Sequence, residues 1–132
     1  YSTQNLLKKV NAELVCTTED PIDSLEFHQK LTSNPIGTKM STAFRPDKAI
    51  LIANDGYNAY VDTLSDVAGI AINTYDDLRD ALRKRIEFFA QNGCKLSDHG
   101  LDQIYFEEFT EAEVASIFKK KRENRKGRMA NG

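Results

Sequence analysis

Short β-prone runs alternate with amphipathic stretches along this chain, and that alternation limits the fold more than any other feature. The β-prone runs lie at residues 13–18, 38–44 and 94–97. The amphipathic stretches lie at residues 3–10, 20–31, 57–64, 74–92 and 110–118. Strands that alternate with helices are typical of βαβ units and a parallel sheet. The sequence therefore predicts an α/β fold with about three parallel strands and flanking helices.

Polar side chains follow each predicted strand. Right-handed crossovers bring the carboxyl ends of parallel strands to one edge of the sheet, so these side chains should meet there. They are Thr17 and Thr18 at the end of the first run and Asp20 after it, Arg45 after the second, and Asp98 and His99 after the third. One cation, several acids and a histidine at one edge indicate a site for a polar ligand.

Arg45 has the most constrained backbone of this group. A residue that precedes a proline is held in an extended conformation, so Pro46 stiffens the chain where the second strand ends. Pro46 suits the first position of a helix, and Asp47 then lies in its first turn, where a negative charge is favoured. The alternative is a surface ion pair between Arg45 and an acid such as Asp47.

Capping residues mark several predicted helices. Asp20 as N-cap and Pro21 at the first position predict a helix that runs through Leu31. Thr74 and Asp77 form a capping-box pair at the start of the helix over residues 74–92. Its predicted buried face holds Leu78, Ala81, Leu82, Arg85, Ile86 and Phe89. Residues 66–73 are predicted to form a connector between the helices over residues 57–64 and 74–92.

Composition indicates one ordinary globular domain. The 132 residues carry a net charge of −2 and are 40% hydrophobic, which points to neither nucleic acid nor a membrane. No apolar run approaches the roughly 20 residues that cross a bilayer. Cys16 and Cys94 lie in apolar runs, which predicts reduced, buried thiols and a cytoplasmic location. Two cysteines and two histidines at scattered spacing form no zinc pattern.

The composition changes after residue 118. Residues 119–128 hold seven basic residues and one acid, Glu123. We expect residues 119–132 to form a solvated, basic helix end, distinct from the α/β part over residues 1–118. A nucleic-acid-binding arm is the alternative, but no aromatic residues interleave with these charges.

Three segments resemble the uronate isomerases, also called glucuronate isomerases, of the metal-dependent amidohydrolase superfamily. They are Cys16–Leu25, Phe44–Ala49 and Gly93–Asp102, which occur in the family's order. The resemblance implies that the chain forms part of a TIM (β/α)8 barrel. A complete barrel takes about 250 residues. With three βα units and Tyr1 in place of an initiator methionine, the chain is expected to be an interior fragment.

The resemblance also implies an activity. Uronate isomerases convert D-glucuronate to D-fructuronate and D-galacturonate to D-tagaturonate by moving a proton from C2 to C1. Arg45 matches the family's arginine, whose planar fork suits a carboxylate of the hexuronate substrate. Asp98 matches a residue that binds substrate and assists proton transfer, and His99 is an adjacent substrate-binding residue.

The chain departs from the family at its metal site. The complete family enzyme uses a divalent metal, with zinc expected, but neither His28 nor His99 belongs to a His-x-His pair. We therefore expect no metal ligand in this chain and no activity from the isolated chain. Open strand edges would allow copies to associate. Two alternatives remain: a non-catalytic fragment, and a flavodoxin-like phospho-receiver domain in which Glu19 and Asp20 form an acid pair.

Overall fold

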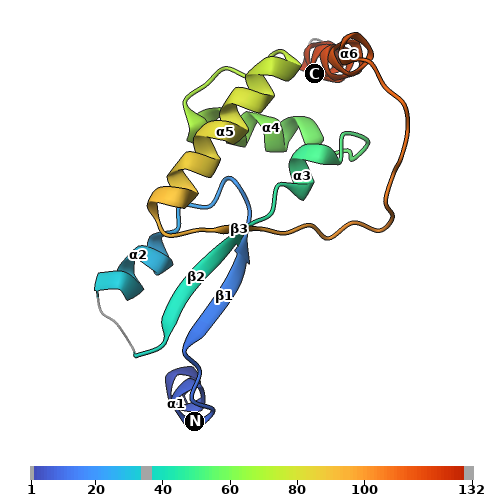
Figure 1. The fold of residues 1–132 in the computed structure, drawn as a ribbon. Helices are drawn as coiled ribbons and strands as arrows, with labels where there is room; N and C mark the ends of the chain where they lie inside the picture. The colour runs from blue at the N-terminus through green and yellow to red at the C-terminus, as the bar shows by residue number, and fades with distance from the viewer. Residues whose placement is uncertain (1, 34–36, 130–132) are drawn as a thin grey trace.

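The computed structural model describes residues 2–33 and 37–129 (Figure 1). Its elements are α1 (Thr3–Lys9), β1 (Leu14–Glu19), α2 (Glu26–Ser33), β2 (Lys39–Phe44), α3 (Asp47–Ile50), α4 (Tyr57–Ala68), α5 (Tyr75–Gln91), β3 (Leu96–Ser97) and α6 (Glu111–Met129). No helix in these described ranges has the length and apolar character to cross a membrane.

The three strands form one parallel sheet in the order β1-β2-β3. Glu19 lies opposite Phe44, and Phe44 lies opposite Ser97, so the carboxyl ends of all three strands are aligned. This confirms the predicted α/β fold with parallel strands. A flavodoxin-like sheet would instead place the first strand between the second and third. The observed order is that of consecutive strands in a barrel, and it argues against a phospho-receiver domain.

Most of the core lies between the helices rather than on the sheet. In Figure 1, α4 and α5 pack side by side beyond the carboxyl ends of the strands, and α6 lies against their far end. The buried cluster comprises Tyr57, Val61, Leu64, Ala68, Ile72, Leu78, Ala81 and Phe118. The members from α4 and α5 recur at helical spacing, which is why the amphipathic pattern predicted that these two helices exist.

A second, smaller cluster joins the sheet to α5. Leu25, Phe44 and Phe89 are all at least 95% buried, and the rings of Phe44 and Phe89 meet edge to face at 5.1 Å. This contact fixes the carboxyl end of β2 against a long helix. The residues that follow Phe44 therefore leave from a rigid point.

The first strand is more exposed than predicted. Along β1, exposed residues alternate with half-buried ones, and Cys16 is exposed while Cys94 is half-buried. Both thiols are free, as expected, but the prediction that both are buried is wrong. The cause is that β1 lies at the edge of the described sheet, with β2 as its strand neighbour on one side, and that Cys16 borders a hollow.

The segment after β1 is a loop rather than the start of a helix. The predicted N-cap at Asp20 is wrong, because α2 begins only at Glu26. Asp20 accepts a hydrogen bond from the N–H of Ile22, and Asp23 accepts one from the N–H of Leu25. Such turns compete with a helical first turn. Leu25 then takes a left-handed φ of 55°, which a helix does not allow.

Other boundaries differ by smaller amounts. Pro46 is the N-cap of α3 rather than its first residue. The predicted connector at 66–73 is partly helical, because α4 continues to Ala68 and ends at Gly69, whose φ is 66°. The capping box of Thr74 and Asp77 is confirmed. Ile86 does not belong to the buried face of α5, since it is 50% exposed.

The basic segment continues α6 without a break. Lys119 and Lys120 are exposed, as predicted, but Arg122 is only 7% exposed. Its guanidinium donates to the carbonyl of Ile72 at 3.1 Å and to the carboxylate of Asp62 at 2.8 Å. The prediction of a fully solvated helix end is therefore wrong at Arg122. Side chains from residue 125 onward lie outside the described part, and the domain boundary at residue 118 stays a prediction.

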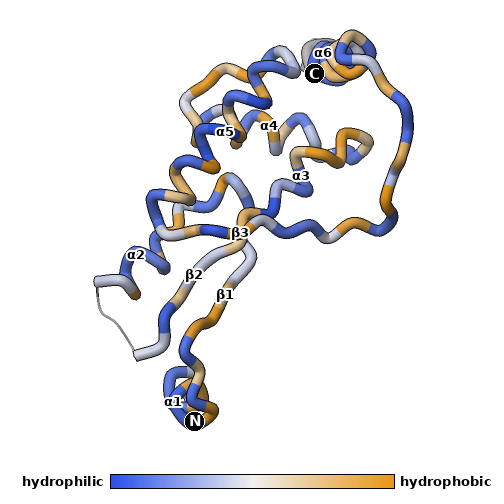
Figure 2. The backbone as a smooth tube through the Cα atoms, viewed as in Figure 1, coloured by the Kyte–Doolittle hydropathy of each residue, from blue (hydrophilic) through white to orange (hydrophobic). Residues whose placement is uncertain are grey.

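The loop between β3 and α6 exposes large apolar side chains. Ile104, Tyr105 and Phe106 are 89%, 72% and 98% exposed. Figure 2 shows hydrophobic segments along this loop, which runs apart from the helices. Contiguous exposed apolar residues are typical of a surface that a larger assembly covers.

Candidate functional site

The carboxyl ends of β2 and β3 place Arg45 and Asp98 next to each other. The N–H of Arg45 donates to the carbonyl of Glu19 at 3.0 Å, and the N–H of Asp98 donates to the carbonyl of Phe44 at 3.0 Å. Each residue thus continues the pairing of its strand by one position. The prediction that both residues lie at one edge of the sheet is confirmed by this register.

The two side chains form an ion pair. Nη2 of Arg45 donates to Oδ2 of Asp98, and Nε of Arg45 lies 4.0 Å from Oδ2 of Asp47. Nε is buried and makes no hydrogen bond within the described structure. The side chains of Arg45 and Asp98 remain 39% and 43% exposed, so a ligand could reach the charged groups from solvent.

Asp47 links the Arg45 turn to the loop after β3. Its Oδ1 lies 2.8 Å from Nδ1 of His99, and its Oδ2 accepts the N–H of Gly100 at 2.6 Å. A Cβ on Gly100 would lie 3.4 Å from Oδ2 of Asp47 and 3.6 Å from Nη1 of Arg45. The absence of a side chain at Gly100 therefore lets the loop approach these charged groups closely.

Both carboxylates at this site stay ionised at lower pH than usual. The hydrogen bond from Arg45 lowers the pKa of Asp98, and its positive charge and the N–H of His99 act in the same direction. Burial raises the pKa of Asp47, but the N–H of Gly100, the His99 ring and the Arg45 charge together lower it below its ordinary value. The site is therefore a cluster of two carboxylates, one guanidinium and one imidazole.

A second polar group lies after β1. The hydroxyl of Tyr60 donates to Oδ1 of Asp20 at 2.8 Å, and Nζ of Lys48 lies 4.0 Å from Oδ2 of the same carboxylate. Burial and then the adjacent Asp20 raise the pKa of Tyr60, so its hydroxyl remains a donor. Asp20 is thus held by α4 and lies at the same edge of the sheet as Arg45.

Arg85 supports the loop that carries Asp20. It is only 7% exposed, and its guanidinium donates to the carbonyls of Pro21 at 2.6 Å and Asp23 at 2.8 Å. These two hydrogen bonds tie the loop after β1 to the middle of α5. The helical pattern placed Arg85 correctly on the buried face, but no local signal indicated its partners more than 60 residues away.

Thr17 does not join the Arg45 cluster. Its hydroxyl lies 2.8 Å from Nε2 of His28 on α2, and Oε1 of Glu19 lies 3.9 Å from the same nitrogen. Thr18, which was also predicted at this edge, is exposed. His28 is therefore a half-buried helix histidine held by β1.

The described residues do not fit a metal centre. They contain no group of three or more His, Cys, Asp or Glu side chains placed to hold a metal ion. Asp47, Asp98 and His99 instead use their polar atoms on Arg45, on Gly100 and on one another.

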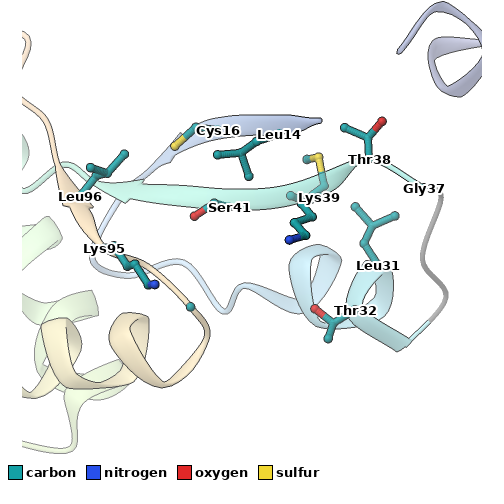
Figure 3. Close-up of a pocket in the computed structure, with 12 residues that line it drawn as sticks. Leu14, Cys16, Leu31, Thr32, Gly37, Thr38, Lys39, Ser41, Lys95 and Leu96 are labelled. Atoms are coloured by element: carbon teal, nitrogen blue, oxygen red, sulfur yellow. The ribbon is translucent and has the colours of Figure 1, made fainter. Parts of the chain in front are cut away.

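A hollow of about 770 Å³ lies elsewhere, between α2 and the sheet. Figure 3 shows Leu31 and Thr32 of α2 facing Lys39 and Ser41 of β2 across it. It is mostly apolar and contains neither Arg45 nor Asp98. Lys39 and Lys95 line it, but it has no carboxylate or imidazole that could move a proton, so the polar cluster at the strand ends remains the candidate site.

Comparisons with known proteins agree on one family. A family model described as glucuronate isomerase matches residues 1–131. A uronate isomerase from Flavobacterium johnsoniae is 82% identical over 125 residues, which cover 95% of this chain and 27% of that protein. A uronate isomerase from Phocaeicola vulgatus is 46% identical over 121 residues, covering 91% of this chain and 26% of that protein.

Solved structures agree with the fold. A uronate isomerase from Thermotoga maritima is 31% identical with a TM-score of 0.85, and the match covers 90% of this chain and 26% of that one. A glucuronate isomerase from Caulobacter crescentus is 24% identical with a TM-score of 0.82, covering 93% and 26%, which shows the fold alone. The chain spans about a quarter of the length of the relatives it matches. By sequence and by fold, the chain belongs to the glucuronate isomerase family.

Proposed function

We propose that this chain supplies part of the active site of a uronate isomerase. The reaction would convert D-glucuronate to D-fructuronate, and D-galacturonate to D-tagaturonate, by proton transfer from C2 to C1. The observation that carries the proposal is the pairing of Arg45 with Asp98 at the aligned ends of β2 and β3. In α/β barrels, residues at the carboxyl ends of the strands perform the chemistry.

Arg45 is proposed to bind the carboxylate or paired oxygens of the hexuronate. Its guanidinium is already oriented by Asp98 and by the charge of Asp47, so little side-chain entropy is lost on binding. Asp98 would accept hydroxyl hydrogen bonds and assist the proton transfer, since its low pKa keeps it an acceptor. His99, 2.8 Å from Asp47, would contact the substrate beside them.

The longer protein should bind a hexuronate and neither nucleic acid nor membrane. The modest net charge of −2 supports this expectation, as does the ordinary composition. The exposed apolar loop at Ile104–Phe106 and the open strand edges support association with further βα units or with other copies. A cytoplasmic location is proposed with the activity.

The test compares Arg45→Met with Lys48→Met in a full-length uronate isomerase that contains this sequence. Losing one charged partner of a bound anion costs roughly 2–5 kcal/mol, which is on the order of 30-fold or more in kcat/KM. Lys48 is a matched control, because its 66% exposed side chain approaches Asp20 only at 4.0 Å. Steady-state kinetics and a melting curve are measured for both variants. Near-normal kinetics with a lowered Tm in Arg45→Met would show that the arginine only stabilises the loop.

A further inference from the structure

Asp47 receives two hydrogen bonds from one loop, one on each carboxylate oxygen. Oδ1 contacts Nδ1 of His99 at 2.8 Å, and Oδ2 accepts the N–H of Gly100 at 2.6 Å. The carboxylate is largely buried, since its side chain is only 14% exposed, and it lies in the first turn of α3. One residue after β2 thus determines how the loop after β3 lies.

This geometry determines which ring nitrogen of His99 carries the proton. An ionised carboxylate only accepts hydrogen bonds, so Nδ1 must be the donor in this contact. In the neutral imidazole, Nε2 is then unprotonated and can act as an acceptor. The His99 side chain is 43% exposed, and no hydrogen bond from the described residues engages Nε2. Nε2 of His99 is therefore free of partners among the described residues and acts as a hydrogen-bond acceptor.

We infer that Asp47 is a positioning residue that sets the tautomer and orientation of His99, so that Nε2 accepts a hydrogen bond or proton from the substrate. The inference rests on the proposed function, in which Asp47 contributed only its negative charge beside Arg45. It gives Asp47 a second task at His99. Asp47 itself would not touch the substrate. It would act through His99 and, by its bond to Gly100, through the position of the loop.

Asp47→Asn should reverse the direction of the hydrogen bond at Nδ1 of His99. The N–H of Gly100 can only donate, so it takes the one remaining oxygen of the amide. The amide NH₂ then faces Nδ1 of His99 and donates to it, which moves the ring proton to Nε2. The variant is nearly the same size and keeps both hydrogen bonds, yet it presents the wrong tautomer. A buried aspartate beside a catalytic histidine has this orienting role in the serine protease triad.

The first measurement is NMR of the 132-residue chain labelled with ¹⁵N in its imidazole rings, at about pH 8.5, above the ordinary imidazole pKa of about 6.5. The chain has only two histidines, so His28→Gln assigns the remaining signals to His99. We expect Nδ1–H in the wild type and Nε2–H in Asp47→Asn. Asp55→Asn, at an exposed turn, should leave the tautomer unchanged. A wild-type ring protonated at Nε2, or no change in Asp47→Asn, would overturn the inference.

The second measurement is kinetics of the full-length enzyme. An unmatched hydrogen bond of about 1–3 kcal/mol corresponds to roughly 5- to 150-fold, so kcat/KM should fall by at least about fivefold in Asp47→Asn. Because the ionised carboxylate of Asp47 also stabilises the fold, the rates are measured well below the melting temperature of each variant. Unchanged kcat/KM despite a switched tautomer would also contradict the inference. If the wild-type enzyme showed no isomerase activity, the proposed function would fail while the NMR result still decided the role of Asp47.

Discussion

Replacing Arg85 with methionine should destabilise the chain more than any change to a neighbouring basic residue. Methionine keeps the apolar stem but leaves the carbonyls of Pro21 and Asp23 without their donors, and it removes the cation from the Phe88 ring at 4.2 Å. Hydrogen bonds to charged groups contribute about 1.5–3 kcal/mol each. Burial lowers the pKa of Arg85, which shows that holding this charge inside has an energetic cost. That cost offsets part of the loss, so the expected net change is about 2–4 kcal/mol.

The assay is unfolding of the full 132-residue chain in urea and by heat. A loss of about 3 kcal/mol lowers Tm by roughly 10 °C for a domain of this size. Lys84→Met is the matched control, since it removes one positive charge from the adjacent, exposed position of α5. An exposed substitution should stay within about 0.5 kcal/mol. Equal midpoints for the two variants would show that Arg85 does not hold the loop after β1.

Three further predictions concern the last helix, pH and metal. Arg122→Met should lower the free energy of unfolding by about 2–3 kcal/mol, because its carbonyl and carboxylate partners lose a charged donor, whereas Lys120→Met should have little effect. Asp47 and Asp98 have lowered pKa values when folded, so their stabilising effect is present above the ordinary pKa of 3.8 and disappears as pH falls below it. Thermal melts from about pH 6 to about pH 2 should show this loss, because it is complete only when the pH has fallen through the lowered pKa values. Asp47→Asn should reduce the slope, and a wild-type Tm that does not change over this range would contradict it. After dialysis the isolated chain should retain no equivalent of zinc or manganese and should not isomerise glucuronate; elemental analysis and a coupled assay check both.

Local patterns were enough to predict the helices and the parallel sheet. The periodicity of Tyr57, Val61 and Leu64 predicted α4, and the capping pair of Thr74 and Asp77 predicted the start of α5. These signals act over one or two turns of chain, so the sequence expresses them directly. Boundaries failed where side chains competed locally with the helix, as Asp20 does in the loop before α2.

The candidate site was partly predictable. Arg45 and Asp98 were expected at one edge because parallel strands align their carboxyl ends, and the register confirms this placement. Their roles in binding and catalysis stay predictions, as does that of His99. The bond between His99 and Asp47 joins residues 52 positions apart, and no spacing rule relates them.

What the sequence determined by itself is the order of elements, the parallel sheet and the resemblance to uronate isomerases in three segments. Tertiary structure alone decided that Asp47 faces His99, that Arg85 holds the loop after β1, and that Arg122 is buried. The physical reason is the range of the interactions. Periodicity and capping depend on neighbours within a few residues, whereas a buried charge takes whichever carbonyls and carboxylates the packed helices bring near it.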